Sequence, residues 1–427
     1  MIGRYSCESI NKIWSDAGKF SCWFDVEIAH LEAQACCAEI LAFLKAKQKL
    51  IDWDKFAEQV AKHEAYLKHD VLAFLRVLED EFSDAASKLH RGLTSSDIVD
   101  TAFALQLTKA GAEILSRLSE LLKALWQKAQ ENKRKICLGR THGQAAQPTT
   151  VGIKLLGHFC ELSRGHKRLQ KACEEIAVGK LSGAVGTYSY SSAEVEEKAL
   201  SILGLRPETV ASQIVSRDRH AQFFSTLAII GGSLERLALE FRLLMHGQVG
   251  EAQEPFSHKQ QGSSAMPHKK NPVLCENISG LMRLVRSYSL AILENQALWH
   301  ERDISHSSVE RVVAPDATNI MAFCLKRMTD IIIALEFNYE QIANNLAHAG
   351  DSLQSQAIMI ALIDKGLARS QAYDIIQKAA FKKSSLQVAL VKAGINNYLS
   401  NDELQSLLAL PKLSDAEDLL FDRARNF

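Results

Sequence analysis

Residues 262–272 read GSSAMPHKKNP and place a serine close to several basic or titratable side chains. The segment has neither the phosphate-binding pattern G-x-x-x-x-G-K-[ST] nor the G-x-S-x-G turn of hydrolases, so it indicates neither chemistry. His268, Lys269 and Lys270 follow Ser263 closely, and a cationic setting lowers the pKa of a hydroxyl group. We therefore interpret Ser263 as a candidate base that removes a proton from a substrate.

Two further polar segments carry hydroxyl and imidazole groups. In TSSD (94–97), Thr94 and Asp97 fit a capping box, and the segment is either a helix cap alone or a site where a helix N-terminus holds an anion. In GRTHGQAAQPTT (139–150), His142 lies on a polar turn. His158, by contrast, falls on the apolar stripe of the helix that follows, which predicts a core histidine.

Residues 298–311 read LWHERDISHSSVER, a composition too polar to predict a buried face. A solvated charged surface is one interpretation. Phosphate recognition by Arg302 and Arg311 with the nearby serine hydroxyls is the other, because guanidinium groups bind phosphate in a bidentate manner. The spacing of six between His300 and His306 fits no common metal-ligand pair, so no metal site is predicted.

Long helices must position these segments. The first 147 residues contain no proline, which favours uninterrupted helices, and helices are predicted over 97–132 and from about 151. KICLG (135–139) and SGAVGTY (182–188) are predicted as short extended pieces, too isolated to build a sheet-based domain. The fold class is therefore all-α. One long helix within 221–250 carries apolar residues in alternating steps of four and three, namely Phe223, Leu227, Ile230, Leu234, Leu237, Phe241 and Leu244.

Three helical domains are expected. The cap-like TSSD segment suggests a boundary near residue 95, and short segments broken by HAGDS, KAGIN and LPKLSD suggest another near 345. The predicted domains are an N-terminal helical domain (1–95), a central long-helix bundle (96–345) that assembles into a multi-subunit helical core, and a C-terminal helical domain (346–427).

The charge and cysteine content restrict the partners. Fifty basic residues balance fifty acidic ones, so no overall field favours nucleic acid or a membrane surface. Nine cysteines, including the adjacent Cys36 and Cys37, show no C-x-x-C spacing, and we expect reduced thiols in a cytoplasmic protein. Neither a signal peptide nor a transmembrane segment is predicted.

Taken in order, these motifs resemble the fumarase/aspartase superfamily of lyases, whose signature loop GSSxMPxKxNP matches residues 262–272. RYS (4–6), KHD (68–70), SQIVSRDRH (212–220) and the 298–311 segment resemble the adenylosuccinate lyase family within it. The resemblance implies β-elimination of fumarate from adenylosuccinate, giving AMP, and from the succinylated aminoimidazole carboxamide ribotide of purine biosynthesis, giving AICAR. It implies no metal and no organic cofactor.

The resemblance also assigns roles to residues. Ser263 would be the base, His142 the acid that protonates the departing nitrogen, and Glu276 the residue that orients His142. Lys269 and Asn271 would hold the succinyl carboxylates, and His69 and His90 would lie near the reacting atoms. The remaining positions that match substrate contacts are Arg4, Tyr5, Lys68, Asp70, Thr94, Ser95, Gln213, Asn277, Arg302, Ser307 and Arg311.

A helix over 97–132 would be about 50 Å long, which separates TSSD from the THG turn at 141–143. If both serve one site, different subunits must supply them, and the superfamily's homotetramer, with sites built from three subunits, satisfies this requirement. Arg91 and Lys68 depart from the family pattern, which leaves fine substrate preference open.

Two other classes of function remain. Another superfamily member, argininosuccinate lyase or carboxymuconate cycloisomerase, would not need the arginines at 302–311, and a non-catalytic helical scaffold would not need the intact acid and base.

Overall fold

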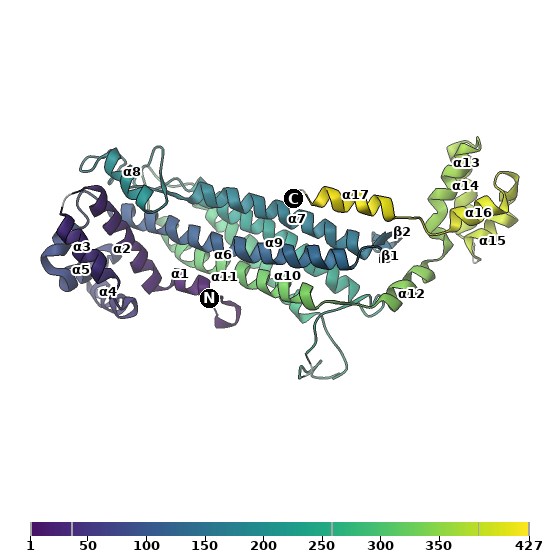
Figure 1. The fold of residues 1–427 in the computed structure, drawn as a ribbon, viewed down its shortest axis with the longest axis horizontal. Coiled ribbons are helices and arrows are strands. Elements are labelled where there is room, and N and C mark those ends of the chain that lie inside the picture. The colour runs from purple at the N-terminus through teal and green to yellow at the C-terminus, as the bar shows by residue number, and fades with distance from the viewer. Residues whose placement is uncertain (1, 36, 258, 383, 426–427) are drawn as a thin grey trace. The chain divides into compact units, whose positions relative to one another are not determined.

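The computed structural model describes residues 2–35, 37–257, 259–382 and 384–425 (Figure 1). These residues form seventeen α-helices and six strands of two to seven residues, which confirms the all-α prediction. Contacts divide the chain into two compact units, each made of three segments. Unit 1 comprises Met1–Leu121, Arg164–Arg236 and Asn277–Met328, and unit 2 comprises Leu122–Ser163, Leu237–Glu276 and Thr329–Phe427. The division into three domains at 95 and 345 stays a prediction.

Five long helices contribute residues to both units. They are α6 (Ser95–Glu131), α7 (Val151–Ile176), α9 (Asp218–Leu244), α10 (Val273–Glu294) and α11 (Ser305–Ala334). The helices predicted over 97–132 and from 151 are therefore confirmed as α6 and α7. All seven residues of the stripe predicted within 221–250 are buried on α9, because steps of three and four keep them on one helix face. At Gly111 of α6, an added Cβ would lie 2.5 Å from the Cys173 sulfur, so only glycine permits this close approach.

Unit 1 adds a group of shorter helices around an aromatic core. The rings of Phe20 and Trp23 on α2 pack edge to face with centroids 5.3 Å apart, and both contact Phe74 on α5. The shorter elements of unit 1 are η1 (Gly3–Tyr5), α1 (Glu8–Trp14), α2 (Asp16–Ala33), α3 (Ala38–Gln48), α4 (Trp53–Leu67), α5 (Asp70–Phe82), η2 (Ser83–Lys88), β3 (Val178–Gly179), α8 (Ala193–Ile202) and β4 (Arg206–Pro207).

The extended piece predicted at 182–188 is wrong, because these residues form a loop of turns. Gly183 and Gly186 have φ values of +84° and +76°, a region that glycine enters readily, and a Cβ at Gly186 would lie 2.0 Å from the Ala211 carbonyl oxygen. The buried ammonium of Lys180 forms an ion pair with Asp97 and donates to the Gly183 carbonyl oxygen at 3.0 Å. A buried cation therefore fixes the start of this loop against the first turn of α6.

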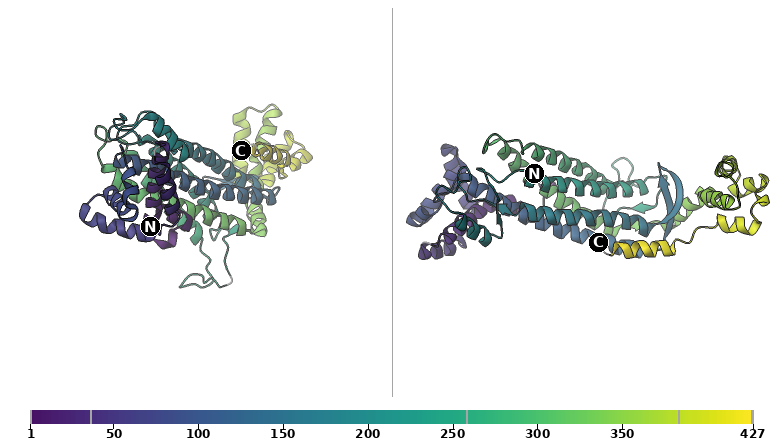
Figure 2. Two further views of the ribbon diagram at one scale, coloured as in Figure 1. Left: turned by 60° about the vertical axis from the view of Figure 1, so that its left-hand side comes forward. Right: turned by 90° about the horizontal axis from the view of Figure 1, so that it is seen from above.

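Unit 2 contains the predicted strand at 135–139, which is confirmed as β1 (Ile136–Thr141) and pairs antiparallel with β2 (Gln144–Thr150). The last helix, α17, runs alongside the helices of this unit (Figure 2), where the Phe421 and Trp126 rings lie 5.8 Å apart. The other elements of unit 2 are β5 (Ala252–Gln253), β6 (Glu336–Phe337), α12 (Tyr339–Ala349), η3 (Asp351–Gln354), α13 (Ser355–Asp364), α14 (Arg369–Ala380), α15 (Leu386–Lys392), η4 (Ile395–Asn397), α16 (Asn401–Leu408) and α17 (Ser414–Ala424).

Two expectations about the whole chain can be compared with the described residues. None of the eight described cysteines forms a disulfide, in agreement with the expectation of thiols, while Cys36 lies outside the described residues. No described helix combines the length and the apolar character that crossing a membrane would require.

Candidate active site

The candidate acid His142 lies at the tip of the β1–β2 hairpin in unit 2. Thr141 pairs with Gln144, and the two turn residues, His142 and Gly143, have φ values of 53° and 74°. Positive φ at both positions is the signature of the type I′ hairpin turn, so the predicted polar turn is confirmed. The imidazole is exposed, as a group that must reach a substrate has to be.

A buried carboxylate anchors this hairpin. Arg140 donates to both oxygens of Glu251, at 2.5 and 3.1 Å, although Glu251 is almost completely buried. Asn345 donates to the same carboxylate at 2.7 Å and to the Val249 carbonyl oxygen at 2.8 Å. Because the guanidinium is bidentate, the strand just before His142 is held in one orientation.

The candidate base Ser263 lies in unit 2, in the irregular loop between β5 and α10, the label of which appears in Figure 1. The Ser263 amide donates to the Lys269 carbonyl oxygen at 3.2 Å and closes the loop into a narrow turn. Its side-chain oxygen accepts from the amides of Ala265 and Met266, at 3.4 Å each. Amide donors directed at this oxygen favour its deprotonated form. Gly262 permits the narrow turn, since a Cβ there would lie 2.3 Å from the Pro267 carbonyl oxygen.

Glu276 is exposed on the first turn of α10, shortly after Lys269 and Asn271 in the loop. The buried Glu254 accepts from the amides of Leu274 and Cys275, at 3.1 and 2.8 Å, and so caps this helix. Within the described part of unit 2, no hydrogen bond joins His142 to Glu276. The orienting role of Glu276 and the carboxylate-binding roles of Lys269 and Asn271 therefore stay predictions.

In unit 1, three polar side chains meet in what we call the anion group, Ser96, Gln213 and Arg302. One nitrogen of Arg302, Nη1, donates to Gln213 Oε1 at 2.5 Å and to Ser96 Oγ at 3.3 Å. The Gln213 amide also donates to the Glu301 carbonyl oxygen at 3.3 Å. The structure thus brings together two predicted contacts, Gln213 and Arg302, and adds Ser96 next to the predicted Ser95.

The KHD segment meets α11 through an exposed ion pair. The Arg311 guanidinium donates to Asp70 at 2.5 Å, and these two residues are separated by 241 positions in the chain. His69 caps α5, accepting from the Leu72 amide at 3.4 Å, while Lys68 ends α4 with a φ of 55°. Ser307 lies half-buried on the first turn of α11. Asp70 and Arg311 therefore lie together, and their roles in substrate binding stay predictions.

Tyr5 and Asn277 contact one aromatic and cationic pair. The Tyr5 ring packs against Phe323 with centroids 5.5 Å apart, and the Arg327 guanidinium lies 4.4 Å from the centre of the Phe323 ring. Arg327 in turn donates to the side-chain oxygen of Asn277. Arg4 precedes Tyr5 and is exposed. Arg327 was absent from the predicted site, because its segment carries no motif.

His90 is bound by a buried carboxylate. Its Nδ1 lies 2.7 Å from Glu27 Oε1, and its amide donates to Glu27 Oε2 at 2.7 Å. Burial disfavours a charged imidazole, but the hydrogen bond and charge of Glu27 outweigh it and raise the pKa of His90.

Close by in the chain, the Thr94 amide donates to Asp97 at 2.7 Å just before α6 begins at Ser95, which confirms the predicted cap.

A buried charge cluster next to the anion group was not predicted. Arg217 lies between two carboxylates, Asp100 on α6 and Glu310 on α11, and His220 and His306 lie close to it. All five are buried, so the expectation that 298–311 is too polar to be buried is wrong for His306 and Glu310. The reason is that the opposite charge comes from a distant segment, which local composition does not reveal.

The two histidines of this cluster should affect acid stability. Burial and the charge of Arg217 lower the pKa of His220 to about 3 and that of His306 to about 4. Both stay neutral in the folded state, whereas the unfolded chain binds protons below about pH 6.5, so this stability is present above pH 6.5 and is lost as pH falls. Between pH 7 and 4.5 we expect each histidine to remove about 2 to 3 kcal/mol from the free energy of unfolding.

Urea unfolding of wild type and His306→Asn at pH 7 and 4.5 checks this prediction. The variant should lose about 2 to 3 kcal/mol less than the wild type over this range, and other titrating groups cancel in the comparison. His348→Asn, at an exposed histidine, is the matched control and should behave like the wild type. An identical loss in wild type and His306→Asn would contradict the assignment.

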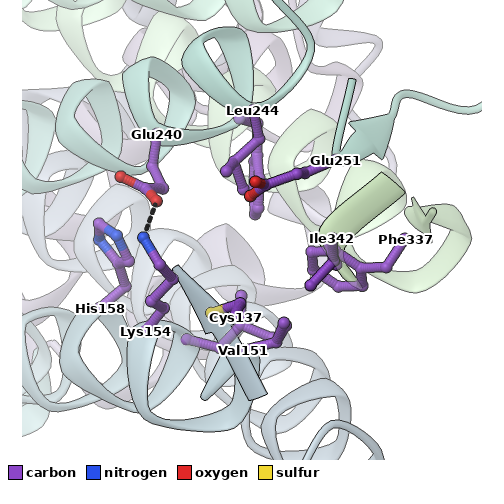
Figure 3. Close-up of a pocket in the computed structure, with 11 residues that line it drawn as sticks. Cys137, Val151, Lys154, His158, Glu240, Leu244, Glu251, Phe337 and Ile342 are labelled. Carbon is purple, nitrogen blue, oxygen red and sulfur yellow. Dashed lines mark hydrogen bonds and ion pairs between the residues drawn. The ribbon is translucent and has the colours of Figure 1, made fainter. Parts of the chain in front are cut away.

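A small cavity lies elsewhere in unit 2 (Figure 3). It is about 10 Å³ in volume, roughly the space for one water molecule. Lys154 and Glu240 form an ion pair of 2.9 Å at its wall, beside the buried His158, and burial raises the pKa of Cys137 there to about 12. The predicted core position of His158 is confirmed. The cavity is too small for a nucleotide, and none of the predicted site residues lines it.

Comparison with known proteins decides the family. A family model described as Lyase matches residues 16–286. Adenylosuccinate lyase from Thermotoga maritima is 41% identical over 99% of this chain and 99% of its own length. The chain belongs to the adenylosuccinate lyase family. The family's enzyme from Synechocystis is 45% identical over 89% of this chain and 88% of its own. The protein is therefore a carbon–nitrogen lyase.

Solved structures agree on the fold. A fumarate lyase from Mesorhizobium sp. BNC1 superposes with a TM-score of 0.89 at 24% identity, covering 100% of this chain and 99% of its own. A 3-carboxy-cis,cis-muconate lactonizing enzyme from Pseudomonas putida superposes with a TM-score of 0.85 at 25% identity, covering 99% and 97%. The fold is shared with a lactonizing enzyme, so the fold alone does not distinguish an adenylosuccinate lyase from a carboxymuconate cycloisomerase. Sequence identity to adenylosuccinate lyases makes that distinction.

Proposed function

We propose that this lyase eliminates fumarate from adenylosuccinate, giving AMP, and from the succinylated aminoimidazole carboxamide ribotide, giving AICAR. The observation that carries the proposal is the similarity to adenylosuccinate lyases, 41% identity over 99% of this chain, together with an intact GSSAMPHKKNP loop. A scaffold without activity would not need to keep a serine, a histidine and a cationic loop in these positions.

The reaction breaks one C–H bond and one C–N bond and forms the C=C bond of fumarate. Ser263 takes the proton from the carbon next to a carboxylate, and the electron pair spreads into that carboxylate. Lys269 and Asn271 hold the succinyl carboxylates and so stabilise the developing charge. His142, oriented by Glu276, gives a proton to the departing nitrogen. Ser263 later releases its proton to solvent, and His142 takes one up from solvent, so both groups return to their starting states.

The residues of unit 1 bind the nucleotide. Arg302 binds Ser96 and Gln213 through Nη1 alone, and among the described residues its Nε and Nη2 make no hydrogen bond, which supports a role for these two nitrogens in binding a phosphate oxygen. Thr94 and Ser95 offer hydroxyl and amide groups at the N-terminus of α6. The other proposed contacts, by position in the matched motifs, are Arg4, Tyr5, Lys68, His69, Asp70, His90, Asn277, Ser307 and Arg311.

Incubation of the purified protein with each succinylated nucleotide, followed by measurement of fumarate and of the released nucleotide in equal amounts, tests the proposal. Argininosuccinate and carboxymuconate serve as alternative substrates. Fumarate from adenylosuccinate at a rate far above that from argininosuccinate supports the proposal. Turnover of an alternative substrate alone, or of none, overturns it.

We also propose a homotetramer with shared sites, in the cytoplasm. Helix α6 has 37 residues and spans about 55 Å, with TSSD at its first turn and the His142 hairpin after its last. One copy therefore supplies these two motifs to different sites. Thiols at all eight described cysteines fit a reducing compartment, and fractionation of cells would test that placement.

Dilution tests the shared site. As the protein is diluted through the range in which gel filtration or sedimentation shows subunits separating, we expect specific activity to fall in parallel with the tetramer fraction, because a monomer has incomplete sites. An excess of the inactive Ser263→Ala variant, added to the diluted wild type, should form mixed tetramers with it. These should restore part of the specific activity of the wild-type subunits. A fully active monomer would contradict the proposal.

A further inference from the structure

Arg217 uses every hydrogen-bond donor that its side chain has. The guanidinium Nε donates to Glu310 at 2.9 Å, and Nη2 donates to the other Glu310 oxygen at 3.2 Å and to Asp100 at 2.9 Å. Nη1 donates to Asp100 at 2.6 Å and to the Val215 carbonyl oxygen at 2.9 Å. An arginine has five such N–H groups, so this one is bidentate to two carboxylates and has no donor left for a ligand.

These bonds join three separate segments of unit 1. Asp100 lies on α6, Glu310 on α11, and Val215 in the loop before α9. Asp100 also accepts from the Val215 amide at 2.9 Å, which fastens that loop a second time. Arg217 and its partners are nine-tenths or more buried, so water does not compete with the bonds.

The three residues of the anion group lie in or just before the same three segments. Ser96 precedes Asp100 by four residues and lies one turn before it on the same face of α6. Gln213 precedes Arg217 by four residues in its loop, and Arg302 lies eight residues before Glu310. Each member of the anion group thus lies four to eight residues along the chain from Arg217 or from one of its two carboxylate partners.

We propose that Arg217 is a positioning residue, which holds Ser96, Gln213 and Arg302 in the geometry that binds the phosphate of the nucleotide substrate. The inference rests on the proposed function, because it assigns the anion to that substrate. Arg217 itself does not touch the ligand. Its role is specific to arginine, since a lysine ammonium has three donors and cannot be bidentate to two carboxylates.

The charge balance gives this role a pH dependence. Two carboxylates share one guanidinium, while burial and Arg217 keep the neighbouring His220 and His306 neutral above about pH 5. Burial, with the repulsion of Asp100, raises the pKa of Glu310 to about 7 despite the opposing effect of Arg217. The other polar groups near Glu310 and His306 are Asn295 and Arg302. Protonation of Glu310 puts an O–H against an Arg217 N–H and so removes one of the two bonds between them. The clamp is therefore complete well above pH 7 and weakens as the pH falls through 7.

The test compares Arg217→Lys with Arg219→Lys. Arg219 is the matched control, an arginine two residues away whose ion pairs with Glu208 and Glu175 are partly exposed. For Arg217→Lys we expect KM for adenylosuccinate and Kd for AMP to rise about tenfold or more, with kcat within about threefold, because binding geometry and not the reacting atoms is changed. Arg219→Lys should leave all three within about twofold.

Glu310→Gln supplies a second measurement that does not require Arg217 to be changed. In the wild type, Kd for AMP should rise as pH falls from 8 to 6 by more than phosphate protonation alone explains, and the excess should vanish in Glu310→Gln. An unchanged KM and Kd in a folded Arg217→Lys variant, or identical pH profiles for wild type and Glu310→Gln, would overturn the proposal. If the wild type turns over no adenylosuccinate, the proposed function fails, while the AMP measurements still decide the role of Arg217.

Discussion

Ser263→Ala is expected to release fumarate from adenylosuccinate about 10² to 10⁴ times more slowly than the wild type, with KM within about threefold. The reason is that removal of a proton from carbon is slow without a base held next to it. Ser263 is half-buried, and its oxygen accepts from the amides of Ala265 and Met266. Alanine removes the proton acceptor but leaves the hydrogen bond from the backbone N–H of residue 263 to the Lys269 carbonyl oxygen, so the loop keeps its closed turn.

Ser264→Ala is the matched control for this prediction. Ser264 is the next residue of the same loop, and its exposed side chain makes no hydrogen bond to any described residue. We expect its kcat to stay within about threefold of the wild type. A substrate that carries deuterium in place of the hydrogen that Ser263 removes provides a second readout. A slower abstraction step should increase the isotope effect on kcat in Ser263→Ala. Equal losses in both variants would show that loop structure, and not a base, had been damaged.

Much of the fold followed from local pattern. The buried stripe of α9, the length of α6 and the start of α7 at Val151 each depend on periodicity or on a cap, which neighbouring residues determine. The 182–188 loop did not follow, since its shape depends on Lys180 reaching Asp97, a partner 83 positions away. Local sequence predicted the helices and strand β1, and distant contacts decided the loop.

The candidate site shows the same division. The motifs named Gln213 and Arg302 separately, but their contact arises because residue 213 meets residue 301 through the backbone, which no spacing reveals. Arg217, Asp100 and Glu310 were missed because a buried arginine and an exposed one look alike in sequence. A partial signal existed, since Arg217 lies inside the quoted SQIVSRDRH segment. The roles of Ser263 and His142 rest on the family resemblance and on the experiments proposed for them.

The second large effect is expected for His142→Asn, with kcat for adenylosuccinate lowered about 10² to 10⁴-fold. Asparagine tolerates the positive φ of this turn position, and the Arg140–Glu251 anchor is untouched, so the hairpin should keep its form. The loss should depend on the leaving group, because an amine that leaves readily needs less help from an acid. Substrate analogues with more acidic leaving nitrogens should therefore recover much of the lost rate in His142→Asn.

The same analogues separate the acid from the base. They should not restore Ser263→Ala to a similar extent, since proton removal from carbon remains slow whichever amine departs. Gln144→Ala, an exposed side chain across the same turn, is the control for hairpin structure and should stay within about threefold of the wild type. If the loss in His142→Asn were the same for every leaving group, His142 would bind or position the substrate and the departing nitrogen would receive its proton from another residue.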